Sequence, residues 1–531
     1  MSADLSDLPW SMKTSSQSAL ILSPSAWRVL HSSCFPIINE SLLITSMRQS
    51  KLTGAISLVV AQAIVLLFGY AAHLWIGRIL GPAPYGVYGV VLSIQSIIGL
   101  LLTLGVPIAV SRFVAQDTAH ARSTLQQAIR LQISIALTIG LFTVLIAHPI
   151  AAILGDPGLT RLIRFVALVI VLQAAYPVFV QFLSGLHFFN RQAALTAVYA
   201  SAKLIGTLAL IYYWQVYGAF AGFAIGGIVA GILGWWWTRR AGGTASRRLP
   251  LKTFLQFAGT YVLILIGLQV LISLDLFMVK ALLGSDVQAG YYNAAVTLAR
   301  IPYLLLQGLT FVLLPSVSAL TKPGADRTRA KTFIASVVRY LVILITPGAL
   351  LAAATSRSLI TLFYSQQYLP AAGALTLLML GLSAIAFFLL LVNIAAGAGR
   401  AKAGLALTVL MIAVSAGTGA FLIPRFGIFG AALQTTIAGA VGCLYLAVYT
   451  HRTFAIPVPY RTLINSGIAS AIAVAPTYIW KADGLLLPMQ YLLLGGVYIA
   501  ALILLQEVSP ADRKRIAGIH PILSRLAPAD S

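Results

Sequence analysis

The sequence has few charged residues, few acids and almost no cysteine. Only 9% of its 531 residues are Asp, Glu, Lys or Arg, whereas soluble globular proteins carry about 25%. Hydrophobic residues make up 59%, which excludes an ordinary soluble enzyme and allows many membrane-crossing helices of about 20 apolar residues each. The two cysteines, Cys34 and Cys443, are too few for a disulfide framework or a four-cysteine metal site.

The shortage of acids leaves a large excess of basic residues. The chain has 35 Lys and Arg against 12 Asp and Glu, a net charge of +23. In a soluble chain this excess would suggest nucleic-acid binding, but in a membrane protein it first reflects orientation, because basic residues concentrate on the cytoplasmic side. The densest cluster, Arg239 to Lys252, is interpreted as a topology signal, with anionic-lipid contact as the alternative. We expect no nucleic-acid partner.

Long apolar runs recur from residue 53 onward and predict about fourteen transmembrane helices in the lipid bilayer. The runs are continuous rather than alternating, so helices are favoured over a β-barrel. Basic residues at the two termini and in the even-numbered connections outnumber those in the odd-numbered connections about threefold. This asymmetry predicts a multi-pass protein whose amino and carboxyl termini are both cytoplasmic.

Residues 1–46 differ from the rest of the chain. They are rich in serine, and their apolar runs are too short for a signal peptide. From Met47 a short basic segment leads directly into the first long apolar run. We expect residues 1–46 to be a disordered extension or to precede the true start.

Two pairs of motifs indicate an internal duplication. Leu80–Tyr88 resembles Leu283–Tyr292, and Tyr217-Gly218 resembles Phe426-Gly427. Six helices per repeat would give both halves the same orientation, as in transporters built from parallel repeats. The expected fold is therefore all-α, with two six-helix lobes around a central cavity and two extra C-terminal helices. The expected divisions are lobes at 47–240 and 254–450, a cytoplasmic linker at 241–253, and the extra helices with a cytoplasmic tail at 451–531.

Small and aromatic residues near the helix ends predict particular contacts. Glycines four residues apart share one helix face and predict close packing; they are Gly218, Gly222 and Gly226. Tyrosines beside the predicted outer turns are interpreted as aromatic-belt residues at the membrane interface; they are Tyr85, Tyr88, Tyr291 and Tyr292.

The motifs occur in an order that resembles the bacterial polysaccharide-export proteins of the Wzx type. Leu80–Tyr88 is followed by Gly105-Val106-Pro107 and Ser111-Arg112-Phe113, and the second half adds Leu274-Asp275 and Leu314-Pro315. The resemblance covers Met47 to Glu507 and implies a flippase of the multidrug/oligosaccharidyl-lipid/polysaccharide exporter superfamily. Such a protein moves polyprenyl-diphosphate-linked oligosaccharide to the outer leaflet of the cell inner membrane without ATP hydrolysis. The sequence contains no Gly-x-x-x-x-Gly-Lys phosphate-binding motif, in agreement with transport without ATP hydrolysis.

The resemblance also implies a biological setting. The cargo would feed the synthesis of a surface polysaccharide such as lipopolysaccharide, O-antigen or exopolysaccharide. A glycan polymerase and glycosyltransferases would be partners, and the flippase itself would act as a monomer without a cofactor.

Basic residues inside the predicted spans are the candidate cargo-binding residues. An ionisable residue at mid-membrane costs about 2.5 to 3.5 kcal/mol on insertion scales. Lys203 and Arg300 fall near the middle of their spans, and Pro302 can kink the helix just beyond Arg300. A diphosphate requires fixed cations in a water-filled cleft, so we predict an anion site formed by Arg300, Lys203 and Arg78. The alternative for Arg300 and Lys203 is a neutralised structural pair. Arg78, Arg164 and Lys280 lie near the outer ends of their spans and are interpreted as snorkelling to the interface or as topology signals, with Arg78 also a candidate for the anion site.

Asp275 is the only acid expected within a span. It could take up H⁺ or Na⁺ and so couple an ion gradient to transport, or it could be a structural partner for Arg300 or Lys280. A lipid-linked peptidoglycan precursor is an alternative cargo for the predicted anion site, since it also carries a diphosphate. A cation-coupled drug antiporter of the same superfamily would need more membrane carboxylates, and a membrane glycan polymerase or ligase would need a large external loop. We therefore expect no enzyme activity.

Overall fold

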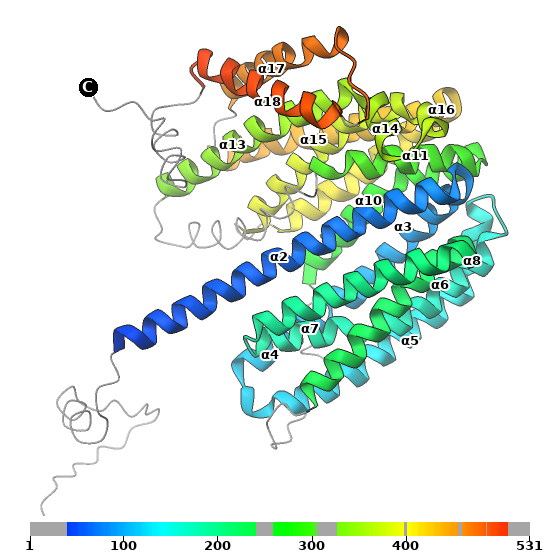
Figure 1. Cartoon of the computed structure of the whole chain (residues 1–531), viewed down its shortest axis with the longest axis vertical. Coiled ribbons are helices and arrows are strands. Elements are labelled where there is room, and N and C mark those ends of the chain that lie inside the picture. The colour runs from blue at the N-terminus through cyan, green and yellow to red at the C-terminus, as the bar shows by residue number, and fades with distance from the viewer. Residues whose placement is uncertain are drawn as a thin grey trace, which may run out of the picture. The chain divides into compact units, whose positions relative to one another are not determined.

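The computed structural model describes residues 40–239, 259–302, 304, 327–397, 401–454, 459–484 and 486–507. It divides into a unit at Met1–Ile56 and a unit at Ser57–Ser531, and all candidate functional residues lie in the second. The expected linker at 241–253 and most of the expected extension at 1–46 lie outside the described residues. The described part contains no strand and is built from these helices (Figure 1): α2 (Glu40–Leu80), α3 (Pro82–Leu104), α4 (Val106–Gln116), η1 (Thr118–His120), α5 (Ala121–Ile153), α6 (Leu159–Gln173), α7 (Tyr176–Gly185), α8 (Phe189–Thr238), α10 (Gly259–Leu283), α11 (Asp286–Ala299), α13 (Arg327–Ala354), α14 (Ser356–Phe363), η2 (Gln366–Ala371), α15 (Ala372–Gly397), α16 (Ala401–Phe454), α17 (Tyr460–Val474), η3 (Ala475–Tyr478) and α18 (Leu486–Leu504).

Ten helical segments of the described chain are long and apolar enough to cross a membrane. This confirms an all-α polytopic membrane protein, although the predicted count of about fourteen is not confirmed. Two of the ten segments, Phe189–Thr238 and Gly404–Tyr449, contain 50 and 46 residues. At a rise of 1.5 Å per residue they would be roughly 75 and 69 Å long if straight, more than twice the hydrocarbon layer of about 30 Å.

Both long segments are instead folded back on themselves. The backbone of Gln215 (φ 46°, ψ −122°) interrupts α8, and that of Gly427 (φ 58°, ψ −137°) interrupts α16. After the break in α8 the two arms touch: a Cβ added to Gly218 would lie 2.1 Å from the Leu210 carbonyl oxygen, and one added to Gly226 would lie 2.9 Å from the Lys203 Cβ. The close packing expected of the glycine face is therefore present, and α8 and α16 are each a helical hairpin.

The two halves of the chain meet where α3 packs against α10 and α11 (Figure 1). The α3–α11 contact is backbone to backbone, since a Cβ on Gly86 would lie 2.2 Å from the Asp286 carbonyl oxygen and one on Gly290 would lie 1.8 Å from that of Pro82. Gly86 and Gly290 are the corresponding glycines of the two duplicated motifs. Both members of the motif pair thus take part in the contact between α3 and α11. The full two-lobe repeat and its central cavity stay predictions.

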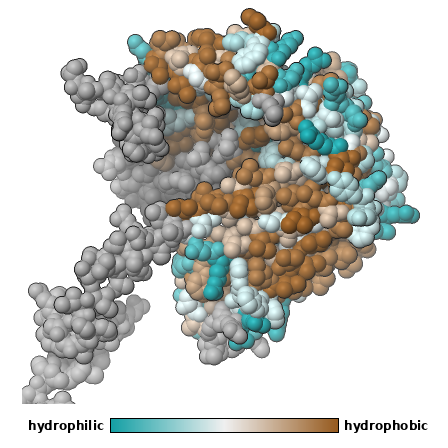
Figure 2. All heavy atoms as spheres, viewed as in Figure 1, coloured by the Kyte–Doolittle hydropathy of each residue, from teal (hydrophilic) through white to brown (hydrophobic). Residues whose placement is uncertain are grey.

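The outer faces of the helices are apolar. Side chains such as Leu145, Ile205 and Leu492 are 67%, 66% and 79% exposed, and Figure 2 shows hydrophobic residues over a broad area of one face. In a soluble protein such a surface would drive association. On membrane-crossing helices it is the surface that contacts lipid.

Candidate functional site

Lys203 lies at mid-depth in the first arm of α8. It stands twelve residues before the break at Gln215, or roughly 18 Å along the helix. Its ammonium nitrogen sits 3.8 Å from the centre of the Phe223 ring, a cation–π contact. No described carboxylate forms an ion pair with Lys203, so the ring is the contact that holds its charge.

Arg300 directly follows the end of α11, fourteen residues after its first residue, or roughly 21 Å along the axis. One terminal guanidinium nitrogen donates to the Ile272 carbonyl oxygen at 3.2 Å. The Nε atom is buried and has no hydrogen-bond partner within the described chain. Buried polar atoms nearly always have a partner, so this N–H is a donor available to a bound group.

His73 of α2 is a buried residue that both cations affect. The charges of Lys203 and Arg300 act on its ring, and its Nδ1 atom is buried without a described hydrogen-bond partner. The ring packs edge-on against Tyr88, with centroids 5.7 Å apart, and Tyr88 contacts Phe220 at 5.2 Å. The charges of the two predicted residues, Lys203 and Arg300, thus act on one shared histidine.

A pocket of about 250 Å³ adjoins the Lys203 contact, because Phe223 forms part of its largely apolar wall. Its polar lining includes Gln95, Gln173 and Tyr199. The Gln95 side chain is only 4% exposed, and its carbonyl oxygen has no partner among the described residues. The pocket therefore offers an amide and a phenol beside a cation, deep within the first half of the chain.

Arg78 lies elsewhere, two residues before the end of α2. Its Nε atom donates to the Tyr364 carbonyl oxygen at 2.7 Å, and a terminal nitrogen donates to that of Leu362. Both carbonyls belong to the C-terminal end of α14, where a cation is favourable. The assignment of Arg78 to the anion site stays a prediction, and its observed role is to tie α2 to α14.

A cluster of buried tyrosines surrounds this contact and joins the two halves. The Tyr85 and Tyr364 hydroxyls are 2.9 Å apart, and the Tyr368 hydroxyl donates to the Gly77 carbonyl oxygen at 2.7 Å. The aromatic-belt interpretation was wrong for three of its four residues: Tyr85, Tyr88 and Tyr292 are 0%, 1% and 0% exposed. The partners of Tyr85, Thr297 and Tyr364, come from the other half of the chain, which a local pattern does not reveal.

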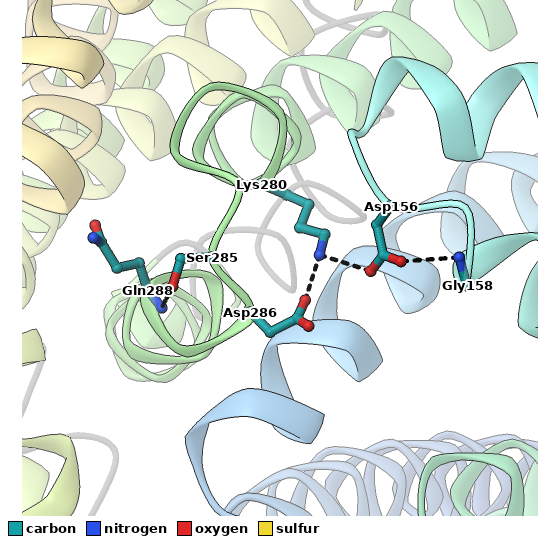
Figure 3. Close-up of polar contacts among 6 residues, drawn as sticks. All are labelled: Asp156, Gly158, Lys280, Ser285, Asp286 and Gln288. Carbon is teal, nitrogen blue, oxygen red and sulfur yellow. Dashed lines mark hydrogen bonds and ion pairs between the residues drawn. The ribbon is translucent and has the colours of Figure 1, made fainter.

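Lys280 closes the same end of the molecule. Its ammonium donates to Asp156 at 2.8 Å and to Asp286 (Figure 3). Asp156 belongs to the α5–α6 connection in the first half, and its second oxygen accepts from the Gly158 amide at 3.0 Å. The Lys280 side chain is only 3% exposed, so snorkelling was the wrong interpretation. We call Lys280, Asp156 and Asp286 the latch; sequence reasoning missed it because nothing local pairs Asp156 with α10.

Asp275 is 2% exposed in α10. One of its oxygens accepts from the Tyr292 hydroxyl at 2.7 Å and from the Thr435 hydroxyl at 3.0 Å, and the other accepts from the Leu276 amide. Lys280 pairs with the latch carboxylates rather than with Asp275. The described residues hold no group of three or more His, Cys, Asp or Glu suited to a metal ion. Asp275 thus sits in a small oxygen cluster drawn from α10, α11 and α16.

Comparison with known proteins gives the same fold. The chain is similar to the lipid II flippase MurJ in an inward closed conformation, with a TM-score of 0.69 at 15% identity over 86% of this chain and 99% of that one. It is also similar to an inward-facing multidrug resistance MATE family transporter of the MOP superfamily, with a TM-score of 0.60 at 15% identity over 74% of this chain and 98% of that one. At 15% identity these similarities show the fold that the chain shares with the two transporters.

Sequence comparison identifies the family. An uncharacterized membrane protein of Methanocaldococcus jannaschii is 29% identical over 191 residues, which are 36% of this chain and 37% of that protein, so the match spans about a third of the relative's length. A model described as "Polysaccharide biosynthesis protein" matches residues 52–321, just over half of the chain. The chain therefore belongs to the polysaccharide biosynthesis protein family.

Proposed function

We propose that this protein is a flippase that carries polyprenyl-diphosphate-linked oligosaccharide across the cell inner membrane by alternating access. The observation that carries the proposal is the pair of mid-depth cations, Lys203 and Arg300, with which no described carboxylate forms an ion pair. Charges inside a membrane protein are expensive and mark ligand pathways. An anionic head group would satisfy both cations and the unpartnered Nε of Arg300.

The chemistry of the site fits a diphosphate bearing sugars. A guanidinium presents a planar fork of donors that matches phosphate oxygens, while an ammonium acts as a compact charge. The pocket beside Lys203 has Gln95 and Gln173 in its wall, and these amides offer hydrogen bonds of the kind that sugar hydroxyls make. The polyprenyl chain needs no such groups and would remain in lipid.

The latch and the tyrosine cluster would form the outer gate of this transporter. With both termini in the cytoplasm, as the distribution of basic residues predicts, the end of the molecule that holds Lys280 and Tyr85 faces outward. Contacts between the halves close that end. The conformation described here would then be closed to the outside, and transport would require these contacts to separate.

Asp275 would be the site of ion coupling. Its carboxylate and the hydroxyls of Tyr292 and Thr435 are oxygen ligands, suited to a proton or to Na⁺. Because these oxygens come from three helices, binding or releasing a cation would change how tightly the helices are joined. Transport by Asp275→Asn, measured with and without an H⁺ or Na⁺ gradient, tests this: loss of gradient dependence with normal protein abundance supports coupling, and loss of abundance alone contradicts it.

Substitution of Arg300 tests the anion site. We expect Arg300→Ala to weaken binding of a polyprenyl-diphosphate glycan by about 10- to 100-fold, since hydrogen bonds to charged groups contribute about 1.5 to 3 kcal/mol. Arg300→Lys should retain part of the affinity, and Lys203→Met should also weaken binding. Arg164→Ala, which removes an exposed arginine of α6, is the matched control. Unchanged binding by Arg300→Ala would show that the head group binds elsewhere.

A lipid-linked peptidoglycan precursor is the second candidate cargo, favoured by the similarity to MurJ over 86% of this chain. Depletion of the protein separates the two: accumulation of a lipid-linked surface glycan at the cytoplasmic leaflet supports polysaccharide export, whereas accumulation of the peptidoglycan precursor supports the alternative. Export would supply lipopolysaccharide, O-antigen or exopolysaccharide synthesis, with glycosyltransferases before the flippase and a glycan polymerase after it. The drug-antiporter alternative is disfavoured because Asp275 is the only acid expected within a span, and cation export would need more membrane carboxylates.

A further inference from the structure

An apolar groove of about 510 Å³ lies on the seam between the two halves, where α3 and α5 meet α10. Every residue that lines it is hydrophobic. Two of them, Ile153 and Leu282, are 75% and 44% exposed, so the groove opens on the lipid-facing surface. Its volume lies within the range of about 300 to 1,000 Å³ typical of small-molecule sites, enough for a segment of a lipid chain.

The groove covers one half of the membrane thickness. Its α10 wall runs from Leu274 to Leu282, roughly 12 Å at 1.5 Å per residue, whereas half of the hydrocarbon layer is about 15 Å. Its upper limit coincides with the ends of α5 and α10, beside the latch: Asp156 follows Leu154 by two residues, and Lys280 precedes Ala281. The groove therefore lies in a single leaflet, directly below a charged layer at head-group level.

The two walls differ in stiffness. Six isoleucines from α3 and α5 form one wall; they are Ile94, Ile97, Ile98, Ile146, Ile150 and Ile153. In a helix isoleucine is held almost entirely in one χ1 rotamer, so this wall is rigid and ridged, while Phe277 and Met278 on the other wall can adjust. Because lipid is as apolar as the groove, occupancy depends on packing rather than on the hydrophobic effect. A rigid, ridged wall favours a chain with regularly spaced methyl branches over a straight acyl chain.

We propose that this groove holds a segment of the polyprenyl chain of the cargo in the leaflet beside the latch. The assignment rests on the proposed function for the identity of the cargo. It places the chain across the seam between the halves, so that the tail stays in lipid while the head group passes between them.

Photo-cross-linking of the full-length protein in liposomes tests the groove. The probe is a diazirine-bearing polyprenyl diphosphate without sugars, so the result does not depend on glycan transport. We expect cross-links on α3, α5 and α10, and we expect Ala281→Phe, which fills the groove from the adjustable wall, to reduce them about tenfold, the effect of an overlap costing about 1.4 kcal/mol. Ile153→Trp at the exposed rim is a second blocking variant, and Leu263→Phe, at a 55% exposed position of α10 outside the groove, is the matched control.

Three outcomes would overturn the proposal. These are equal labelling in both blocking variants and the control, cross-links confined to other helices, and equal labelling of the groove by a diazirine-bearing phospholipid with straight acyl chains, which would make the groove an ordinary lipid contact. Selective labelling in a protein that moves no glycan would uphold the groove and refute the proposed function. Glycan transport without labelling in the groove would support the proposed function and refute the groove as a site for the polyprenyl chain.

Discussion

The latch yields the sharpest prediction, because it contains its own control. Asp156→Asn removes the carboxylate that joins Lys280 to the first half of the chain. Asp286→Asn removes a carboxylate from the same ammonium, but both of these residues belong to the second half. Only the first change should therefore release the contact between the halves.

The expected magnitude follows from the exposure of the pair. The Lys280 side chain is 3% exposed and that of Asp156 is 25% exposed, between the fully buried and fully exposed limits. Exposed pairs contribute about 0.2 to 1 kcal/mol, and breaking a buried pair costs about 3 to 5 kcal/mol. Since Lys280 keeps Asp286 as a partner, we expect about 1 to 2 kcal/mol, which shifts the closed-to-open equilibrium about 5- to 30-fold.

Cysteine accessibility measures this shift. Ala289 is fully buried against Gly86 in the α3–α11 contact, and its replacement by cysteine adds only a sulfur atom. In a background without Cys34 and Cys443, the rate of modification of Ala289→Cys by a membrane-impermeant maleimide, applied from outside, reports the open fraction. We expect Asp156→Asn to raise this rate about 5- to 30-fold, as the equilibrium estimate implies.

The reasoning fails if Asp156→Asn leaves the rate unchanged. It also fails if Asp286→Asn raises the rate equally, because the effect would then come from charge around Lys280 rather than from the link between the halves. The carboxylate of Asp286 also stabilises the start of α11, where Ser285 caps the helix. Abundance and thermal stability of both variants should therefore be measured alongside.

Three further changes have defined outcomes. Gly290→Ala would place a Cβ 1.8 Å from the Pro82 carbonyl oxygen. We expect this overpacking to cost about 1 to 3 kcal/mol of stability and to speed the labelling of Ala289→Cys. Gly348→Ala, whose Cβ would meet no atom within 4 Å, should change neither the stability nor the labelling rate. Gln215→Gly should raise thermal stability by about 1 kcal/mol, because relief of about 1 to 3 kcal/mol of backbone strain exceeds the chain-entropy cost of glycine of about 0.5 to 1 kcal/mol; an equal gain in Gln215→Ala would argue against strain as the cause. At Glu507 burial raises the carboxyl pKa, but hydrogen bonds from Thr462, Asn465 and Arg339 outweigh it and hold the pKa below 4.5. A carboxyl group with a lowered pKa stabilises the fold at pH values above its ordinary pKa, and this stabilisation is lost as the pH falls through its pKa in the folded state. The stability advantage of the unmodified protein over Glu507→Gln should therefore be full at pH 7 and shrink below pH 4.5. An advantage independent of pH would contradict this.

The sequence was sufficient where the signal is local. Membrane-crossing runs, the turns at Gly81 and Gly284 and the glycine face of α8 follow from apolar length and residue size, and the structure shows φ angles of 74° and 59° at the two turns. The mid-depth positions of Lys203 and Arg300 follow from counting residues along a helix.

The sequence was insufficient where a contact joins distant segments. Tyr85 looks like an interface residue when only its distance from a helix end is considered, yet it is buried beside Thr297, 212 positions away. Tyr292 is likewise buried, against Asp275 and Thr435. Lys280 looks like a snorkelling residue until Asp156 is found beside it. His73 became notable only when Lys203 and Arg300 were both found to act on it.

The hairpin geometry of α8 bears on how the protein enters the membrane. Its two arms are joined without a loop, and their contacts, such as the Thr207 hydroxyl to the Ala219 carbonyl oxygen at 3.1 Å, link residues close in sequence. Such contacts need little loop closure and form early. The fifty residues of α8 would thus leave the insertion machinery as one preassembled pair, around which the later helices of the first half can dock.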